Sequence, residues 1–266
     1  MADSSKQPDE PTFDRRSADI GIVCTHNAEI KPLLKVLDRT RKYVDETSVF
    51  RGGFLDEVIR IAIVEAGSGF AAHRAVTETL IKEHNPAWVI SLGFSSALTS
   101  DVKAGDICLA NEICDTHGNA LPIKCTIPES KRIFVRKHVV ADQHPRTVAE
   151  KQKLAESSLA VACDTTSLAV AQACNHMSTE DRTIRFLSIR SILDSFDEQV
   201  SAKGIDTMFE PPAGKKPNPV KGLLSRFRKD PELGPWTVRA NQQAIGLNKF
   251  TLGIIRQLAE KLGKSR

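Results

Sequence analysis

The stretch WVISLGFSSAL (residues 88–98) decides the fold of this chain. Its first half, WVISL, is a short apolar run typical of a buried strand, and Gly93 ends that run before small and polar residues. Just upstream, Gly67 and Gly69 precede a helical pattern over residues 70–83, which Asn85-Pro86 terminates. A glycine-rich turn, a helix and a buried strand in this order predict a crossover unit of an α/β protein.

The same alternation continues in both directions along the chain. Apolar runs predict further strands at residues 20–23, 48–54, 58–64, 107–110, 134–140, 159–162 and 184–192. Helical periodicity predicts helices around residues 29–37, 146–156, 165–176 and 240–261. Strands separated by helices of about 10 to 15 residues predict one α/β domain with a mostly parallel or mixed sheet.

Length and composition fit that single domain. The chain has 266 residues, and 41% of them are apolar, which is enough for a sizeable core. No window approaches the ~18 uninterrupted apolar residues of a membrane-spanning helix, so we expect no integral membrane association. Residues 1–17 are polar and predict a disordered tail rather than a secretory signal. Residues 198–239 are rich in Gly, Pro and Lys and predict an irregular basic insertion.

Composition also bears on partners and compartment. The formal net charge is only +4, and no basic run alternates with aromatic residues, so we expect no nucleic-acid partner. The six cysteines form no CxxC pair, which indicates free thiols in a reducing compartment and predicts a cytoplasmic protein. His26, His117 and Cys114 lack zinc-type ligand spacing, so we expect no metal and no cofactor.

Polar and glycine residues follow several of the predicted strands. They are Glu29, Gly67–Gly69, Gly93–Ser96, Asp164 and Asp194. Ligands of open α/β sheets bind at the carboxyl ends of the strands. These residues therefore predict a small-molecule site at that edge of the sheet.

Four segments, in this order, resemble the nucleoside phosphorylase superfamily, and most closely its methylthioadenosine/S-adenosylhomocysteine nucleosidase branch. They are IGIVCTHNAE (20–29), AGSGFAA (66–72), VISLGFSSAL with VKAGDI (89–98 and 102–107), and AVACD with IRSILD (160–164 and 189–194). The resemblance covers about residues 19–197 and implies a three-layer α/β/α domain with a mixed central sheet. It also implies cleavage of the N-glycosidic bond of a purine nucleoside or 5′-modified adenosine, and a homodimer.

The resemblance assigns roles to three acids. A glutamate in the place of Glu29 activates the attacking water, an acid in the place of Asp164 binds the ribose, and an acid in the place of Asp194 protonates the leaving base. General acid–base help of this kind is worth ~10² to 10⁴-fold. Structural explanations stay open beside these roles: Glu29 as a solvated helix residue, Asp164 as the N-cap of the next helix, and Asp194 as a turn or cap residue.

The resemblance further implies that Gly69, Gly93, Ser95 and Arg190 lie against the substrate, together with residues at which this chain departs from the family. Phe94 stands where a small or hydroxyl residue is usual, and is either a core aromatic or a residue that contacts the ligand.

Two more departures concern the sugar and the base. Cys163-Asp164 replaces a Met-Glu pair at the ribose. His144 stands where an aromatic residue usually stacks on adenine, and Pro145 follows where a backbone N–H usually contacts the base. Proline has no N–H to offer, so the base specificity stays open.

Two other functions remain. In a phosphorylase, phosphate would replace water and would need arginines, but Arg74, Arg136, Arg146 and Arg190 lie in no phosphate motif. A carboxylate at Glu29 would also repel that anion. In a non-catalytic nucleoside-binding homologue, the fold would persist around an altered site.

Overall fold

The computed structural model describes residues 17–44, 48–200 and 233–263. Residues 1–16 of the expected N-terminal tail and most of the expected insertion at 198–239 lie outside these residues. The strands are β1 (Ile20–Cys24), β2 (Asp38–Val44), β3 (Val49–Leu55), β4 (Ile59–Glu65), β5 (Trp88–Ala97), β6 (Ile107–Asp115), β7 (Ala120–Pro122), β8 (Ile133–Val140), β9 (Ala162–Asp164) and β10 (Arg185–Asp194). The helices are α1 (Asn27–Leu34), α2 (Phe70–His84), α3 (Val148–Ser158), α4 (Ser167–Met177) and α7 (Leu233–Lys261).

All the strands belong to one mixed sheet. The long strand β5 lies at its centre, parallel to β1 on one side and to β10 on the other. From β1 the sheet continues through β4 and β3 to the edge strand β2. From β10 it continues through β6, β8 and β9, and β9 pairs back with β5, so this half closes into a ring. The prediction of a mixed sheet is confirmed.

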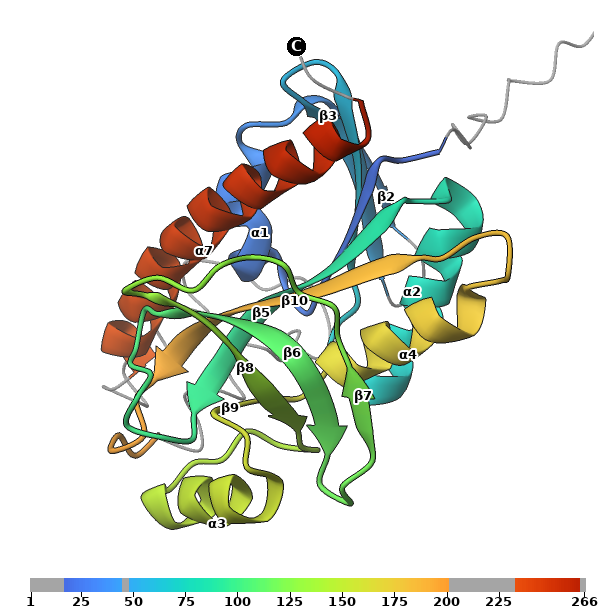
Figure 1. Ribbon diagram of the computed structural model, residues 1–266. Coiled ribbons are helices and arrows are strands. Elements are labelled where there is room, and N and C mark those ends of the chain that lie inside the picture. The colour runs from blue at the N-terminus through green and yellow to red at the C-terminus, as the bar shows by residue number, and fades with distance from the viewer. Residues whose placement is uncertain (1–16, 45–47, 201–232, 264–266) are drawn as a thin grey trace, which may run out of the picture.

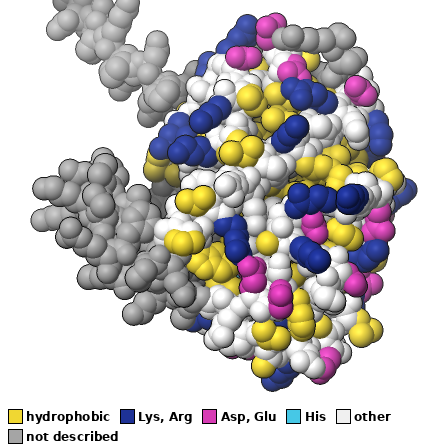
Figure 2. All heavy atoms as spheres, turned by 90° about the vertical axis from the view of Figure 1, so that its left-hand side faces the viewer, with side chains coloured by type: hydrophobic (Ala, Val, Ile, Leu, Met, Phe, Trp, Pro, Cys, Tyr) yellow, Lys and Arg dark blue, Asp and Glu magenta, His cyan; other side chains and the backbone are white. Residues whose placement is uncertain are grey.

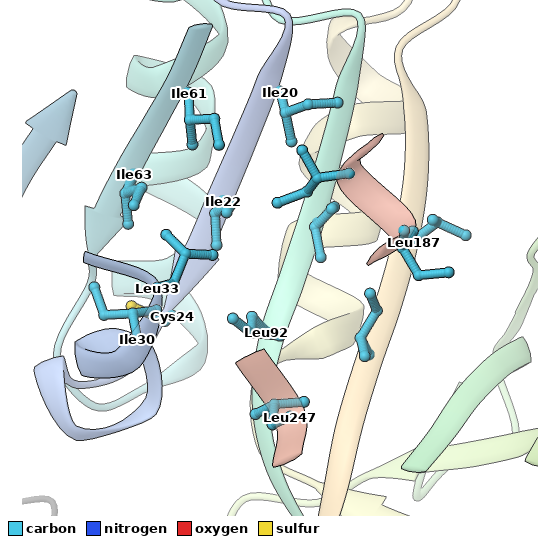
Figure 3. Packing of buried hydrophobic residues seen from close by; sticks show 14 of the residues in the cluster. Ile20, Ile22, Cys24, Ile30, Leu33, Ile61, Ile63, Leu92, Leu187 and Leu247 are labelled. Carbon is cyan, nitrogen blue, oxygen red and sulfur yellow. The ribbon is translucent and has the colours of Figure 1, made fainter. Parts of the chain in front are cut away.

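Helices cover both faces of the sheet and give the three-layer α/β/α architecture that was predicted. Figure 1 shows α1 and α7 on one side and α2 and α4 on the other. Between the sheet and the first helix pair lies a core in which Ile22, Ile63 and Leu92 of three strands pack with Leu33 of α1 and Leu247 of α7 (Figure 3). None of the described helices has the length and apolar character needed to span a bilayer.

The boundaries of several elements differ from those predicted. Strand β2 was not predicted, because its sequence DRTRKYV is almost wholly polar and exposed at the sheet edge. The strand predicted at 159–162 is instead β9 at 162–164, since Leu159 adopts a left-handed conformation (φ 58°) as the C-cap of α3. Helix α7 starts at Leu233, seven residues before the predicted Ala240.

The surface carries charges of both signs. Figure 2 shows Lys and Arg side chains interspersed with Asp and Glu on the side of the molecule where α7 lies. All six cysteines are free thiols, and five of them are buried.

Candidate active site

A cavity of about 610 Å³ opens beside the middle of β5, where β1, β8 and β9 end and where α2 and α4 begin. That volume suits a small-molecule ligand. Its walls are formed by Thr25, Glu29, Ser68, Gly69, Phe70, Gly93, Phe94, Val140, Ala141, Asp142, Gln143, His144, Arg146, Asp164, Thr165, Thr166 and Arg190. Seven of the ten residues expected at the site therefore meet here, whereas Ser95, Cys163 and Asp194 do not line the cavity.

Glu29 projects from the first turn of α1 and is buried. Its Oε2 accepts hydrogen bonds from the backbone N–H groups of Thr25 (2.8 Å) and His26 (3.0 Å). Burial raises the pKa of Glu29 to about 7, against the lowering effect of these N–H groups and of Arg190. A carboxyl group with this pKa can accept a proton near neutral pH, as a general base must.

Gly93 allows Glu29 to approach Arg190. A Cβ atom at position 93 would lie 2.7 Å from Glu29 Oε1 and 3.2 Å from Arg190 Nη1. The first distance is below any normal contact, so only glycine leaves room for both groups at this wall of the cavity.

Arg190 comes from β10 and is 1% exposed. Its Nε lies 3.2 Å from Asp164 Oδ2, and its Nη2 donates to Ser91 Oγ at 2.7 Å. Its Nη1 has no hydrogen-bond partner among the described residues and lies on the Glu29 side. The guanidinium therefore stands between the two carboxylates and keeps one donor free beside Glu29.

Asp164 is both a helix cap and part of the cavity wall. Its Oδ1 accepts the backbone N–H groups of Thr166 and Ser167 at 2.7 Å each, and its Oδ2 accepts the Ser167 hydroxyl at 2.6 Å. Burial acts to raise the pKa of Asp164, but the Arg190 guanidinium and these donors outweigh it and hold the pKa well below its usual range. Thr166, not Asp164, is the N-cap residue of α4, but the Asp164 side chain binds the first N–H groups of this helix while it also lies at the cavity wall. Asp164 is a stable anion.

Asp194 lies apart from the cavity, in a buried ion pair. Its Oδ2 is 2.5 Å from Lys151 Nζ, and its Oδ1 accepts from Ser96 Oγ at 2.8 Å. Lys151, from α3, also donates to the carbonyl oxygens of Ser195 (2.6 Å) and Glu198 (2.8 Å). Burial raises the pKa of Asp194, while Lys151 and Ser96 act to lower it. The side chains of both members of the pair are at most 1% exposed.

Two histidines that the sequence did not single out lie buried behind the site. His73, in α2, has Nδ1 3.0 Å from Gly69 O and Nε2 3.4 Å from Thr25 Oγ1. Burial lowers the pKa of His73 to about 4 and that of His138, in β8, also to about 4. Both imidazoles are therefore neutral at pH 7, and His73 ties the turn before α2 to the end of β1.

Several residues of the cavity wall were missed in the sequence. Ser68 belongs to the expected Gly67–Gly69 turn. Thr25 and Phe70 lie inside the first two segments that carried the resemblance, so their position in those motifs was an available signal. Asp142 and Gln143 lie in the loop before α3, beside the expected His144, where no periodic pattern distinguishes them.

Known proteins share this sequence pattern and fold. The model of the phosphorylase superfamily matches residues 19–144. No curated protein matches the sequence.

Solved nucleosidase structures resemble most of the chain. A 5′-methylthioadenosine/S-adenosylhomocysteine nucleosidase from Colwellia psychrerythraea 34H, in complex with adenine, superposes with a TM-score of 0.67 at 17% identity over 91% of this chain and 96% of that one. A mutant of the corresponding Helicobacter pylori enzyme, with 5′-methylthioadenosine in its active site, gives 0.66 at 15% identity over 91% and 99%. Futalosine hydrolase of Helicobacter pylori gives 0.65 at 17% identity over 90% and 98%.

At these identities the structures establish the fold alone. The motif order, the family match and the architecture agree with one another. They confirm the resemblance of this chain to the nucleoside phosphorylase superfamily, with the fold of its methylthioadenosine/S-adenosylhomocysteine nucleosidases.

Proposed function

We propose that this protein is a nucleosidase that hydrolyses the N-glycosidic bond of a purine nucleoside or a 5′-modified adenosine. The observation that carries the proposal is the arrangement of Glu29 and Asp164 on either side of Arg190 at one wall of the cavity. A nucleosidase needs a base for water and an acceptor for the ribose hydroxyls, and these two carboxylates differ in pKa as two such roles require.

The proposed reaction starts beside Gly93, where Glu29 Oε1 and Arg190 Nη1 come together. A water molecule held there donates one hydrogen to Glu29 and accepts one from Arg190. As the C1′–N bond breaks, the base leaves with the electron pair, the water oxygen bonds to C1′, and Glu29 takes the water proton. Asp164 accepts hydrogen bonds from the ribose hydroxyls.

In this proposal Asp194 supplies the proton that the leaving base takes up. Its carboxyl group does not line the cavity, so it has to exchange its contact with Lys151 or Ser96 for one with the base. Phe94 and His144 line the cavity and would contact the base and sugar.

A phosphate-dependent phosphorylase is the second candidate, because Arg146 and Arg190 both line the cavity. Arg74 and Arg136 do not: they pair with Glu78 and Glu129. Two carboxylates flank Arg190, and they would repel a phosphate dianion, which favours water. The third candidate is a nucleoside-binding homologue without catalysis.

Two expectations accompany the proposal. The family resemblance leads us to expect a homodimer, which light scattering on the purified chain would test. The six free thiols favour a cytoplasmic location, which localisation of the full-length chain would test.

The test is release of the base from a panel of nucleosides: methylthioadenosine, S-adenosylhomocysteine, adenosine, inosine and 5′-deoxyadenosine, each with and without phosphate. We expect release without phosphate, and its loss in Glu29→Gln and Asp194→Asn but not in Glu78→Gln, a half-buried carboxylate on α2 that lies outside the cavity. Release only with phosphate would favour the phosphorylase. No release by the folded protein, together with nucleoside binding in calorimetry, would favour the non-catalytic homologue.

A further inference from the structure

The turn that follows β10 is held together by one carboxylate side chain. It covers residues 195–198 and comes directly after Asp194, the acid of the proposed reaction. The backbone N–H of Glu198 donates to Ser195 O at 3.2 Å, and the Ser195 N–H donates to Glu198 Oε2 at 2.7 Å. The two ends of the turn are therefore joined both by the backbone and by the Glu198 side chain.

The carbonyl groups of this turn bind the cation of the buried ion pair. Lys151 Nζ donates to the carbonyl oxygens of Ser195 (2.6 Å) and Glu198 (2.8 Å). It also lies 2.5 Å from Asp194 Oδ2. These three acceptors take up the three N–H bonds of the ammonium group. Because a fully buried charge needs all of its partners, a displacement of the turn would either move the ammonium group or leave one of its donors unpaired.

The side chain that closes the turn is also paired with α7. Arg239 Nη1 lies 2.8 Å from Glu198 Oε1 and 2.9 Å from Glu198 Oε2. The Arg239 guanidinium also lies 4.9 Å from the centre of the Trp236 ring on the same helix. The side chains of Arg239 and Glu198 are 37% and 33% exposed, and ion pairs this exposed add little to the stability of a fold. Loss of the pair should therefore disturb the turn without unfolding the chain.

The same helix has a second link to β10. Figure 1 shows the start of α7 beside the end of this strand. Gln243, four residues after Arg239, donates from Nε2 to Leu193 O at 3.3 Å and is 8% exposed. Residues four apart lie on the same face of a helix. This face of α7 therefore holds the chain on both sides of Asp194, at Leu193 and at the turn.

We propose that Glu198 and Arg239 are positioning residues for the proton transfer to the leaving base. Neither of them lines the cavity, so they act through the turn and Lys151. Lys151 fixes one oxygen of Asp194, while the other oxygen exchanges Ser96 for the base. A proton donor needs such a fixed orientation. Both roles rest on the proposed function, in which Asp194 is the acid.

Base release by Arg239→Gln and Glu198→Ala tests these roles on the substrate found in the panel. We expect kcat to fall by about threefold to tenfold, the effect of losing a partly exposed charge-assisted hydrogen bond. KM should stay unchanged, because neither variant alters the cavity wall. Arg239→Lys keeps the charge and should recover most of kcat. Unchanged kcat in both Arg239→Gln and Glu198→Ala would overturn the proposal.

The matched control is Arg256→Gln, which breaks an ion pair of the same kind on the same helix. Arg256 donates to both oxygens of Asp56, at 2.7 Å and 3.1 Å, about 25 Å along α7 from Arg239. Asp56 lies between β3 and β4, so we expect kcat of Arg256→Gln to equal that of the wild type. An equal loss of kcat in this control would overturn the proposal. A rise of kcat in Arg239→Gln would do so too, because the pair would then hold the acid away from the base.

Acetylation of Lys151 tests the same link without any enzymatic activity. An amine-acetylating reagent, followed by mass spectrometry, measures how often this buried side chain leaves its position. We expect acetylation of Lys151 to be about threefold to tenfold faster in Arg239→Gln and Glu198→Ala than in the wild type and Arg256→Gln. The thiol of Cys24, which is 1% exposed in β1, should react with a maleimide at an unchanged rate.

The two labels separate a failure of this proposal from a failure of the proposed function. Unchanged protection of Lys151 in both variants would overturn the link, whether or not the protein releases a base. An equal acceleration at Cys24 would also overturn it, since the whole fold would then have loosened. Faster acetylation confined to Lys151, in a protein that releases no base from any nucleoside, would support the link and count against the proposed function alone.

Discussion

At the scale of single residues, Glu29 shows how burial creates a base near neutral pH. Its pKa of about 7 comes from loss of solvent, which outweighs two backbone N–H donors and Arg190. Only the carboxylate form of Glu29 can take a proton from water. We therefore expect its ionisation to make kcat/KM for base release rise with pH up to about 7 and then level off. Rate measurements from pH 5 to 8 on the substrate identified in the panel would check this.

The Glu29→Gln variant tests whether Glu29 causes this rise of kcat/KM with pH. Glu29→Gln has no group that titrates here, so it should lose ~10² to 10⁴-fold in rate together with the limb at pH 7. A limb that persists unchanged in the residual activity of Glu29→Gln would contradict the assignment of that pKa to Glu29.

The ion pair of Lys151 and Asp194 gives a second prediction for single residues. Lys151→Met removes the nearest cation from a buried carboxyl group, so the pKa of Asp194 rises further above its usual value. If Asp194 is the acid, it then keeps its proton to higher pH, and the fall of activity on the basic side moves upward. The variant should also unfold about 3 to 5 kcal/mol more easily, because it leaves a buried carboxyl group without its partner.

Lys151→Arg is the control that keeps the charge. Activity of this variant should fall at the same high pH as in the wild type, even if the larger side chain lowers stability. If activity falls at the same high pH in Lys151→Met as in the wild type, Lys151 does not set the pKa of the acid that protonates the leaving base.

The sequence predicted some of these residues and could not predict others. Glu29, Asp164 and Arg190 stand in short motifs, and their positions after strands indicated a common site. Lys151 gave no such signal, because a lysine in a helical pattern normally extends into solvent. Its burial depends on the carbonyl groups of Ser195 and Glu198, more than forty positions away in the chain.

At the scale of elements, the last helix holds the first one in place. Asn248 of α7 donates its side-chain N–H to the backbone carbonyl of Glu29 at 2.7 Å and to Ala244 O at 2.6 Å, and it is 1% exposed. Asn248→Ala should therefore lower the free energy of unfolding by about 1 to 3 kcal/mol. It should also reduce kcat, because α1 positions Glu29. Urea unfolding and base release would measure the two effects.

An exposed site on the same helix provides the comparison. Ile245→Ala changes a side chain that is 60% exposed, so it should leave both quantities nearly unchanged. A stability loss in Asn248→Ala without any change in kcat would mean that α7 supports the fold but does not position Glu29.

Elements with an apolar pattern were predictable, and those without one were not. The buried strands β1, β4, β5 and β10 contain continuous apolar runs and were identified to within a few residues. Strand β2 was missed because an exposed edge strand needs no apolar face. Strand β5 continues through Gly93 to Ala97, since the paired strand β10 extends the ladder past the point where the apolar run ends.

At the scale of the whole molecule, the topology of the sheet assembles the site. Thr25 meets Gly93 and Arg190 because β1, β5 and β10 run parallel side by side, and β1 ends level with the middle of the other two strands. The alternation of strands and helices predicted such parallel strands. The closed ring formed by β5, β10, β6, β8 and β9 could not be predicted. It depends on strand pairings between distant segments, and such pairings leave no local sequence pattern.

The pH dependence of stability follows from three groups buried by this architecture. The unfolded chain protonates His73 and His138 near pH 6.5, whereas their folded pKa values are about 4. Glu29 acts in the opposite sense, because its pKa is raised from 4.5 to about 7 on folding. Between about pH 4.5 and 6.5 the unfolded state therefore binds two more protons at the histidines and the folded state one more at Glu29. For these three groups, the free energy of unfolding should rise by about 1.4 kcal/mol per pH unit over this range.

Two substitutions should change that slope in opposite directions. Glu29→Gln removes the proton bound by the folded state, so stability should fall about twice as steeply as the pH is lowered. His138→Leu removes one proton of the unfolded state and should flatten the dependence, and leucine adds no polar group at a site where neither ring nitrogen has a partner among the described residues. Urea unfolding of the three proteins at several pH values between 4.5 and 6.5 would measure the slopes. Because the remaining titratable groups are shared, their contribution cancels in the differences, and equal slopes in the wild type and Glu29→Gln would show that burial does not raise the pKa of Glu29.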